Sequence, residues 1–533
     1  MTPSPAWKSR AEAALGWLVL ATAALALQLI QSVPFDGDTG YHFAVATLLR
    51  QHGILRAFPW TAWSWLADNY SDKELLFHLL IVPFTSLGYK LGCRVVGTIC
   101  GTLVLGTIYS ILRAEKVRWA LLWPLFALAC SGGFVQRFAL VRPHLLAITL
   151  TLWITWAASR RRLGQLAIAS FLFPLAYVAW HQALGLVVLA EIAQRLAGQR
   201  VAWKPLAVVA GGLLLGVLAH PNFPNTFLYF WAINVEVLIQ HAWSDHTGFE
   251  MGGEFRPLKP LSALLFLGIP IVATIASASV TARRRKGDAV AVAFTLATLG
   301  YLVITLRTQR FLEYFVPFAA VGAGLASRAI SGAWAARAAP VALAGSGLFT
   351  ALFGSRPILQ LTTRTDLFAD NVVEALRKVV PPEQKVFTCD WEFTGEMMVA
   401  LPDRVFMISV DPVLFWKKDP ERYRTWFSIT RDPPENPGAL VKDTFGTRYV
   451  MCNVNPAKPK WEGFIDAMDR DPSVRRLGQI GVWSVFDLAP VRRKRAPAPP
   501  PEATAPGAPA PTDTTSAPGS PDPTGSAGSP DGK

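Results

Sequence analysis

The chain has 533 residues; 52% of them are hydrophobic, only 17% are charged, and the mean hydropathy is +0.32. Soluble domains carry about 25% charged residues, so the composition excludes an ordinary soluble protein and indicates a polytopic membrane protein with some soluble mass attached. The formal net charge of +14 does not indicate a nucleic-acid partner, because most basic residues lie in short clusters between apolar runs.

Apolar runs close to the length of a membrane span recur through the first two thirds of the chain. The first run follows Lys8 and Arg10 and is long for the apolar core of a signal peptide, so we expect it to remain as an uncleaved span. A cytoplasmic N-terminus, 1–12, then precedes a transmembrane domain over 13–355. We predict about eleven transmembrane helices, near 13–31, 90–112, 119–133, 144–159, 163–180, 182–197, 205–220, 260–280, 289–306, 311–329 and 339–354.

The loops between these helices differ in charge from one side of the membrane to the other. If the spans alternate in direction, six basic loops fall on one side, and the positive-inside bias makes that side cytoplasmic. The chain after residue 354 is therefore expected outside the cytoplasm. The outer loops, 32–89, 134–143, 221–259 and 307–310, are acidic or of mixed charge. The basic loops contain Lys8 and Arg10; Arg113, Lys116 and Arg118; Arg160, Arg161 and Arg162; Arg195, Arg200 and Lys204; Arg283, Arg284, Arg285 and Lys286; Arg328 and Arg337.

The long first outer loop is expected to contain two short helices. One lies near 39–51 and is followed by Gly53, a residue suited to a C-cap. The other begins in "SDKELLFHLL", where Ser71 and Glu74 form a capping-box pattern. The apolar residues 75–88 are too few to span a membrane comfortably, so we predict an interfacial or re-entrant helix there.

Residues 363–489 have a different pattern, in which apolar and polar residues alternate. The segments "KVFTCDW", "DRVFMISV", "TRYVMCNV" and "VWSVFDL" predict strands, with helical patterns such as "NVVEALRKVV" between them. We predict a small extracytoplasmic α/β domain, whose location would permit a disulfide between Cys389 and Cys452. The Pro-, Ala-, Gly- and Ser-rich tail, 490–533, cannot bury a core and is expected to be disordered.

Polar and ionisable side chains gather at the outer ends of the predicted spans. Ionisable groups near the hydrocarbon cost roughly 2.5–3.5 kcal/mol each, so they usually face a cavity and often mark a functional site. Carboxylates can orient a metal or accept a proton from an attacking hydroxyl, and arginines bind phosphate through paired hydrogen bonds. These residues are Asp36, Asp38 and His42; Arg137, Arg142 and His144; Trp180 and His181; His220 and Asn222; and Arg307, Arg310 and Glu313.

Asp36-Gly37-Asp38 follows the first span, and a long outer loop with short helices, many further spans and a C-terminal extracytoplasmic domain come after it. Together these features resemble the GT-C glycosyltransferases, a superfamily that includes protein O-mannosyltransferases, lipid A aminoarabinose transferases and oligosaccharyltransferases. These integral enzymes use sugars carried on polyprenyl phosphate or diphosphate. "SDKELLFHLLIVPF" is similar to the family's short loop helix before the second span, but lacks the Pro-Pro pair of the mannosyltransferases.

The resemblance implies a polytopic α-helical GT-C-like fold and transfer of a sugar from a polyprenyl-phosphate-linked donor, in contact with membrane lipid, to an acceptor lipid, glycan or protein. The reaction would occur at the outer face of the cytoplasmic membrane, with no nucleic-acid partner. Whether it requires a divalent metal is left open by the resemblance. Asp36 or Asp38 is implied as catalytic base or metal-site residue. The implied phosphate ligands are Arg137, Arg142 and Arg310. The remaining candidates for substrate binding are His42, His144, Trp180, His181, His220, Asn222, Arg307 and Glu313.

Simpler roles remain open for several of these residues. Asp38 could act only as the N-cap of a helix that begins near Gly40. Arg137 and Arg142 could be snorkelling anchors at the end of a span. His42 lies one turn after Asp38, a spacing that permits a metal pair.

Two other classes of function also remain open. A transporter or flippase would place charge near the bilayer midplane and often shows internal repeats, whereas here the polar clusters lie at one face and no clear repeat is found. A membrane-anchored binding protein would act through 363–489, where no nucleophile motif, phosphate loop or metal spacing is found.

Overall fold

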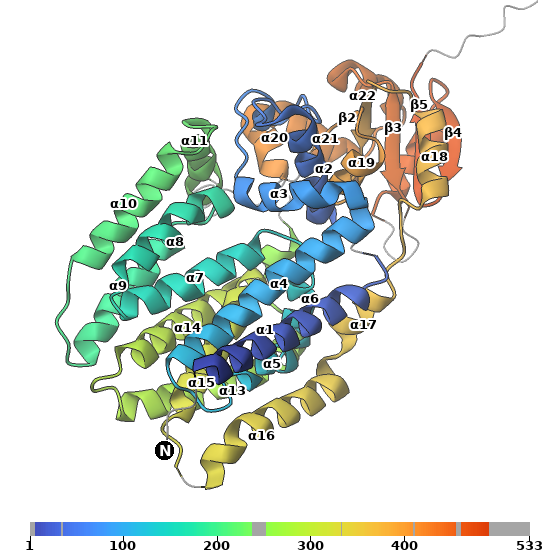
Figure 1. The fold of residues 1–533 in the computed structure, drawn as a ribbon. Coiled ribbons are helices and arrows are strands. Elements are labelled where there is room, and N and C mark those ends of the chain that lie inside the picture. Colours follow the sequence, from blue (N-terminus) through green and yellow to red (C-terminus); the bar gives the residue numbers. More distant parts are fainter. Residues whose placement is uncertain are drawn as a thin grey trace, which may run out of the picture. The chain divides into compact units, whose positions relative to one another are not determined.

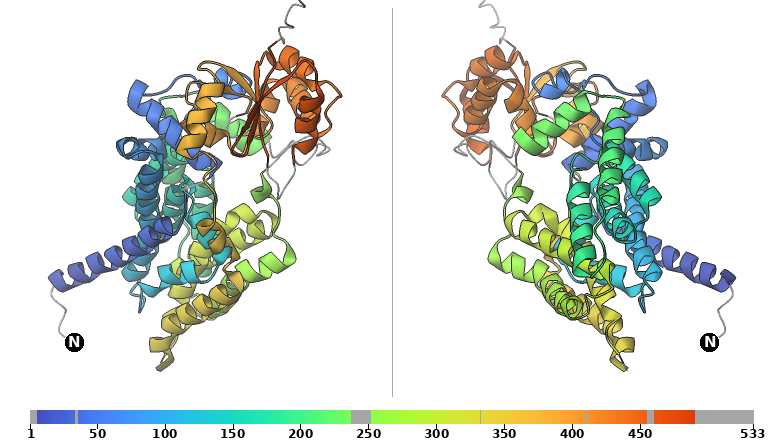
Figure 2. Two further views of the ribbon diagram at one scale, coloured as in Figure 1. Left: turned by 90° about the vertical axis from the view of Figure 1, so that its right-hand side faces the viewer. Right: turned by 90° about the vertical axis from the view of Figure 1, so that its left-hand side faces the viewer.

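A computed structural model describes residues 6–33, 36–236, 252–331, 333–408, 411–454 and 460–489. The tail that we predict to be disordered lies outside these residues. The described chain up to residue 489 belongs to a single compact unit. In it, the strands lie at one end of the long helices, on the same side as the short helices of the first outer loop (Figures 1 and 2).

Helices occupy the segments that we predict to cross the membrane, and the chain is a helical membrane protein. Among the described residues, five helices are long and apolar enough to cross a bilayer on their own, so the number of spans stays a prediction. The helices up to residue 349 are α1 (Ala6–Leu29), α2 (Gly37–His52), α3 (Leu75–Ile81), α4 (Tyr89–Ala114), α5 (Leu122–Ala129), α6 (Gly132–Phe138), α7 (His144–Ser159), α8 (Leu163–Ala176), α9 (Gln182–Leu196), α10 (Lys204–Leu218), α11 (Asn225–Trp231), α13 (Pro260–Arg283), α14 (Ala289–Arg307), α15 (Leu312–Ser327) and α16 (Ala333–Phe349).

The third predicted span, 119–133, is wrong as a single helix. The chain forms α5, breaks, and begins α6, because the Ser131 side chain caps the new helix by accepting a hydrogen bond from the backbone N–H of Phe134 (3.1 Å). Gly132 lies against the π-helical turn η6 (Thr350–Gly354), where an added Cβ would be 1.9 Å from the Gly354 carbonyl oxygen. The break carries the chain toward the outer ends of the helices as the separate short helix α6.

The first outer loop forms the two expected short helices, but their caps differ from the prediction. Gly53 is the C-cap of α2, with φ 71°, as expected for glycine. The N-cap of α2 is Asp36, which rules out the alternative in which Asp38 acts only as the N-cap of this helix. The capping box at Ser71 and Glu74 is wrong: Glu74 makes no side-chain cap bond among the described residues, and Ser71 Oγ bonds Thr226 Oγ1 at 3.0 Å.

Residues beyond 355 add helices around a five-stranded sheet of order β2-β1-β3-β5-β4. β1 is parallel to β2 and β3, and β5 runs antiparallel to β3 and β4. Four of the strands lie in the segments predicted from alternation, and β4 was missed. The elements are α17 (Arg356–Thr362), α18 (Asp370–Val379), β1 (Lys385–Thr388), α19 (Thr394–Ala400), β2 (Val405–Phe406), α20 (Pro412–Lys418), α21 (Pro420–Arg431), α22 (Pro437–Phe445), β3 (Tyr449–Asn453), α23 (Glu462–Arg470), β4 (Arg475–Ile480) and β5 (Trp483–Asp487).

Cys389 and Cys452 form a disulfide that joins the end of β1 to β3 across a sequence separation of 63 residues. In the chain-entropy model, closing a loop of this length stabilises the fold by about 4 kcal/mol. The sheet also shares a hydrophobic core with the first outer loop, since Trp60 packs among buried residues of both, and Trp60 Nε1 donates to the Pro402 carbonyl oxygen at 2.9 Å. The first outer loop and the sheet region therefore pack as one body.

Helices α2 and α19 touch at glycines. A Cβ added at Gly395 would lie 1.6 Å from the Gly37 carbonyl oxygen, and one added at Gly40 would lie 2.6 Å from the Glu396 nitrogen. Both neighbours are backbone atoms, which cannot rotate away. The contact fixes the N-terminal turn of α2, which bears Asp38, against the sheet region.

We predict that Gly395→Ala lowers the thermal unfolding midpoint of the protein in detergent, because the methyl group must push α19 away from α2. Overpacking of this kind typically costs about 1–3 kcal/mol. The control is Gly211→Ala in α10, where an added Cβ meets nothing within 4 Å; its midpoint should be unchanged or slightly higher. Equal midpoints for the two variants would contradict the close helix contact.

Candidate functional site

Three arginines converge on the Glu254 carboxylate, and we call them the arginine cluster: Arg137, Arg142 and Arg310. Arg137 lies in α6, Arg142 in the turn before α7, and Arg310 in the 3-10 turn η5 (Gln309–Phe311). Arg137 and Arg142 are each only 15% exposed and Arg310 28%. Their burial in ion pairs excludes a role as snorkelling anchors, which place the charged head in water or lipid headgroups.

Glu254 lies at the centre of the arginine cluster. Its Oε1 is 2.6 Å from Arg310 Nη1, and its Oε2 is 3.0 Å from Arg137 Nη1 and 3.6 Å from Arg142 Nη1. Burial raises the pKa of this carboxyl, but the guanidinium groups, with Arg310 foremost, hold it well below its usual range. A single anionic group therefore accepts contacts from all three arginines.

Local contacts hold Glu254 in position. It belongs to the 3-10 turn η4 (Gly253–Phe255), and the Gln309 side chain donates to the Gly253 carbonyl oxygen at 2.6 Å. The Arg310 guanidinium also lies 5.3 Å from the centre of the Phe255 ring. The turn η4 is thereby attached to η5, the element that supplies one of the arginines.

Asp36 and Asp38 both contact the arginine cluster through Arg142, but they differ in environment. Asp36 accepts hydrogen bonds from Nε and Nη2 of Arg142, while Asp38 contacts only Nη1, at 2.8 Å. Burial raises the pKa of Asp36, but Arg142 outweighs it and the net pKa is lowered. Burial raises the pKa of Asp38, and the nearby negative charge of Asp36 raises it further. Arg142 lowers this pKa, but the net pKa is raised.

The Glu313 carboxylate and the Tyr177 hydroxyl also contact the arginine cluster. Glu313, with a side chain 0% exposed, accepts a hydrogen bond from Arg137 Nε at 2.8 Å. His144 Nε2 lies 4.0 Å from the same Glu313 oxygen, and Arg310 donates to the Tyr177 hydroxyl at 3.0 Å. The predicted residues Glu313 and His144 therefore lie with the arginines.

His42 faces a second group, which we call the histidine cluster: His42, His78, Glu74 and Asp72. His42 Nδ1 is 2.8 Å from His78 Nε2, and His78 Nδ1 is 2.7 Å from Asp72 Oδ1. The spacing of Asp38 and His42 permits a metal pair, but the two side chains have different partners here: Asp38 contacts Arg142 and His42 contacts His78. Burial raises the pKa of Glu74 to about 7, although Lys73 and His78 oppose it.

The predicted residues His220 and Asn222 support the histidine cluster from the turn after α10. His220 Nε2 lies 2.8 Å from the Asp72 carbonyl oxygen, and the Asn222 side chain accepts from the Asp72 backbone N–H at 3.2 Å. Both residues are buried. They fix the backbone of Asp72 rather than contacting the arginines.

Three predicted residues lie away from both clusters. Trp180 stacks on Phe230 of α11 with ring centres 4.1 Å apart, and His181 meets the same ring edge-on. Arg307 is exposed at the end of α14, and within the described part of the chain no ion pair connects it to the arginine cluster. The structure therefore does not bring Trp180, His181 and Arg307 into contact with the acids near position 37.

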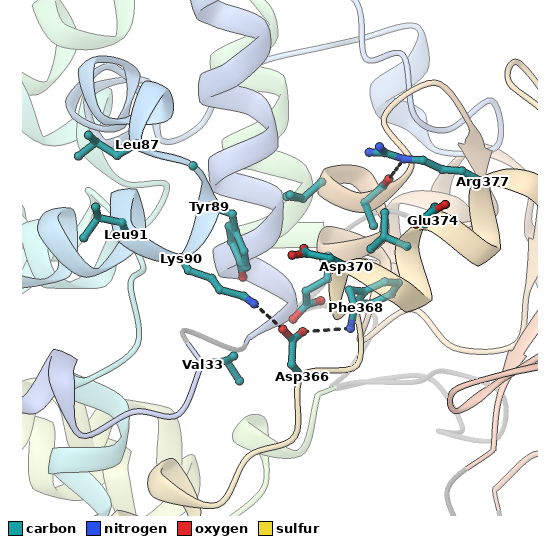
Figure 3. Close-up of a pocket in the computed structure, with 15 residues that line it drawn as sticks. Val33, Leu87, Tyr89, Lys90, Leu91, Asp366, Phe368, Asp370, Glu374 and Arg377 are labelled. Carbon is teal, nitrogen blue, oxygen red and sulfur yellow. Dashed lines mark hydrogen bonds and ion pairs between the residues drawn. The ribbon is translucent and has the colours of Figure 1, made fainter.

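A pocket of about 580 Å³ is lined by residues that include Leu87, Lys90 and Asp366 (Figure 3). It lies between the start of α4 and the segment that leads into α18, where Lys90 Nζ is 2.7 Å from Asp366 Oδ2. Its lining includes Val33, three residues before Asp36, and Glu396 of α19. Burial raises the pKa of Glu396 well above its usual range, and the charge of Asp36 adds to this effect.

The family resemblance implies Asp36 or Asp38 as a catalytic base or a residue of a metal site. The cation between these carboxylates is the Arg142 guanidinium, which contacts both. A metal ion there would have to displace Arg142 or share the carboxylates with it, and the neighbouring carboxylate of Glu254 is held by the arginines. The acidic pair in this arrangement therefore does not fit a metal ion, and we place no metal in the reaction.

Five residues of the site, Asp72, Glu74, His78, Glu254 and Glu396, were not identified as functional residues by the sequence analysis. Glu254 lies in a loop whose pattern carries no motif, so no signal pointed to it. Glu74 was interpreted as a helix cap and His78 as part of an apolar helix. Three residue types that can bind metals, Asp72, Glu74 and His78, nevertheless lie within the seven residues "DKELLFH" and could have been recognised as candidate ligands. Glu396 lies in the sheet region, to which no chemistry was assigned.

Solved structures show which fold this chain has. It matches the archaeal oligosaccharyltransferase AglB from Archaeoglobus fulgidus, in complex with an inhibitory peptide and a dolichol-phosphate, with TM-score 0.55, 12% identity, and 89% and 74% of the two chains covered. It matches ArnT from Cupriavidus metallidurans bound to undecaprenyl phosphate with TM-score 0.53 and 14% identity over 89% and 98% of the chains. The arabinofuranosyltransferase AftD from Mycobacteria gives TM-score 0.55 and 14% identity over 89% and 40%.

All three are GT-C superfamily glycosyltransferases, and the chain has the GT-C membrane fold expected from its sequence. No protein-family model and no curated protein sequence matches it. At 12–14% identity the similarity is one of fold.

We predict that Arg137→Gln lowers the thermal unfolding midpoint, because Glu313 loses its closest cation while fully buried. Breaking one partner of a buried pair costs about 3–5 kcal/mol. The double variant with Glu313→Gln should recover part of the loss. The matched control is Arg307→Gln, which alters an exposed arginine and should change stability by less than about 0.5 kcal/mol. Equal unfolding midpoints for the Arg137 and Arg307 variants would contradict the buried ion pair between Arg137 and Glu313.

Proposed function

We propose that the protein transfers a sugar from a polyprenyl-phosphate-linked donor to a nucleophilic acceptor at the outer face of the cytoplasmic membrane. The observation that supports this most strongly is the convergence of three arginines from separate elements on one anionic group, beside two aspartates of the first outer loop. Guanidinium groups bind phosphate oxygens through charge-assisted hydrogen bonds. The GT-C fold is consistent with such a donor, since ArnT has been solved with undecaprenyl phosphate.

In this proposal the donor phosphate takes the position that the Glu254 carboxylate holds among the arginines. The acceptor oxygen or nitrogen attacks the anomeric carbon, and the bond from that carbon to the phosphate oxygen breaks. Polyprenyl phosphate leaves with an additional negative charge, which the arginine cluster stabilises. A single displacement of this kind inverts the configuration of the sugar.

The environments of the two aspartates suggest separate roles. A general base needs an accessible carboxylate whose pKa is not strongly depressed. Asp38 has a side chain 33% exposed and a raised pKa, so we assign it the proton of the acceptor. Asp36 is bound by two nitrogens of Arg142 and has a lowered pKa, so we assign it the orientation of that arginine.

We further propose that the acceptor enters through the pocket between α4 and the segment before α18, whose lining residue Glu396 interacts electrostatically with Asp36. The pocket has the volume of a small-molecule site and combines apolar lining from Leu87 and Val399 with charged residues such as Lys90 and Asp366. The disulfide between Cys389 and Cys452 supports an extracytoplasmic position for this side of the protein, because disulfides persist in oxidising compartments.

A photo-crosslinkable undecaprenyl phosphate tests the proposed function. With the purified protein in detergent, the label should fall on peptides from α6, the turn before α7, and η5, and unlabelled undecaprenyl phosphate should compete with it. A deletion strain examined by mass spectrometry should lack a glycan on lipid, polymer or protein, and the wild-type gene should restore it. Labelling elsewhere in the chain, with an unchanged glycan profile, would exclude the transferase.

We predict that Glu254→Gln tightens the binding of undecaprenyl phosphate, because the phosphate no longer has to displace a carboxylate. Arg310→Gln should weaken binding by about 10- to 100-fold, which corresponds to the loss of a hydrogen bond to a charged group, about 1.5–3 kcal/mol. Equilibrium binding of labelled lipid measures both, with Arg307→Gln as an unchanged control. Weaker binding by the Glu254 variant would show that this carboxylate does not occupy the phosphate position.

We predict a separation of the two aspartates in the pH dependence of the transfer rate. Asp38 must be deprotonated to act, so the rate falls as the pH drops through its raised pKa. Asp38→Asn should lose about 10²- to 10⁴-fold in rate. Asp36→Asn removes a neighbouring negative charge and frees Arg142, so the pKa of Asp38 falls and the acid limb shifts to lower pH. Release of undecaprenyl phosphate from a panel of its sugar conjugates measures the rates; full activity of both variants would eliminate the proposed roles.

A further inference from the structure

The histidine cluster contains three groups suited to binding a metal ion. His42, Glu74 and His78 each direct one ligand atom to a common point, and these atoms lie within 4.8 Å of one another. All three side chains are at least 95% buried. His42 comes from α2, whereas Glu74 and His78 come from the start of α3, so tertiary packing alone brings the set together.

The second nitrogen of His78 is oriented as in metal-binding histidines. His78 Nδ1 lies 2.7 Å from the Asp72 carboxylate, and the tautomer that donates Nδ1–H to this carboxylate has its Nε2 lone pair available to a metal. Metal-bound histidines nearly always donate their other N–H to a carboxylate or carbonyl, which fixes the tautomer and raises the basicity of the ligand nitrogen. Asp72 is itself held by Asn222 and His220 through its backbone.

Two carboxylate oxygens of the histidine cluster have no hydrogen-bond partner in the described structure. They are Glu74 Oε2 and Asp72 Oδ2, and both are buried. A buried carboxylate oxygen without a partner is costly. A divalent cation among these groups would supply the missing partner for Glu74.

We propose that His42 Nδ1, His78 Nε2 and a carboxylate oxygen of Glu74 bind one divalent transition-metal ion, with zinc as the ion that this donor set fits best. Two histidines and one glutamate form a known zinc ligand set, with distances of about 2.0–2.2 Å. Tetrahedral geometry separates neighbouring ligands by roughly 3.3 Å. The two imidazole nitrogens, now 2.8 Å apart, would move apart by about half an ångström.

Among the ion pairs described for Glu74, the one with Lys73 would repel a bound metal cation. Lys73 Nζ lies 3.6 Å from Glu74 Oε1 and 5.3 Å from the centre of the Tyr229 ring. Because it contacts Oε1, the other oxygen, Oε2, remains available to the metal. The site is separate from the acidic pair at positions 36 and 38, whose cation is Arg142.

Such an ion would fasten α2 to α3 one turn away from Asp38. The proposal concerns metal binding and stability, so it holds or fails independently of sugar transfer. Full-length protein without a histidine tag, purified in detergent and stripped with a chelator, is titrated with ZnCl2. We expect one zinc per chain by equilibrium dialysis and elemental mass spectrometry, and a zinc-dependent rise in the unfolding temperature.

Variants of the three ligands identify the site. His42→Gln, His78→Gln and Glu74→Gln should each lower zinc affinity by at least 100-fold, and Asp72→Asn, which preserves the shape of the supporting residue, by 10- to 100-fold. His52→Gln, at the exposed end of the same helix, should retain one zinc and the full thermal shift. A chain that binds no stoichiometric zinc, or whose zinc affinity is the same in His52→Gln, His78→Gln and Asp72→Asn, would overturn the proposal.

Discussion

Pairing of buried guanidinium groups is the constraint on which the outer part of this protein depends. Arginine remains charged in any protein environment, and a buried charge without a partner costs several kcal/mol. Arg137, Arg142 and Arg310 therefore need carboxylates at their outer-face positions. The partners are Asp36 and Glu254, from two other parts of the chain, and Glu313, which lies three residues after Arg310 and pairs with Arg137. Satisfying these charges brings together four segments that are distant in sequence, around positions 36, 137–142, 254 and 310–313.

The same pairing makes the arginine cluster suited to chemistry on an anion. Charges that are already desolvated and oriented need little reorganisation when a phosphate replaces a carboxylate. Glu254 preserves the arrangement of the arginines by supplying the negative charge that they require. Glu254 thus holds the arginines together, and in the proposed function the donor phosphate takes its place among them.

Helix α2 connects the three functional parts of the structure. Its N-terminal turn presents Asp36 and Asp38 to Arg142, its next turn presents His42 to His78, and Gly40 lies against α19. Asp38 and His42 are one turn apart but have different partners. The Asp38 carboxylate pairs with the Arg142 guanidinium, and the His42 imidazole contacts His78 in the histidine cluster. The placement of one short helix thus sets the geometry of both clusters and of their contact with the sheet region.

The sequence by itself determined the properties that depend on local pattern. Apolar runs located the long helices, alternation located four of the five strands, and the chemistry of Asp36, Asp38, Arg142 and Arg310 was visible at the ends of apolar segments. Tertiary structure decided which of these groups meet. Glu254, in a loop without a motif, became the centre of the arginine cluster, and Glu74 changed from an expected cap to a buried partner of two histidines. Local sequence encodes the tendency of a segment to be helical or buried, whereas the identity of a charge's partner depends on the packing of distant segments, as for Arg137 and Glu313, which are 176 residues apart.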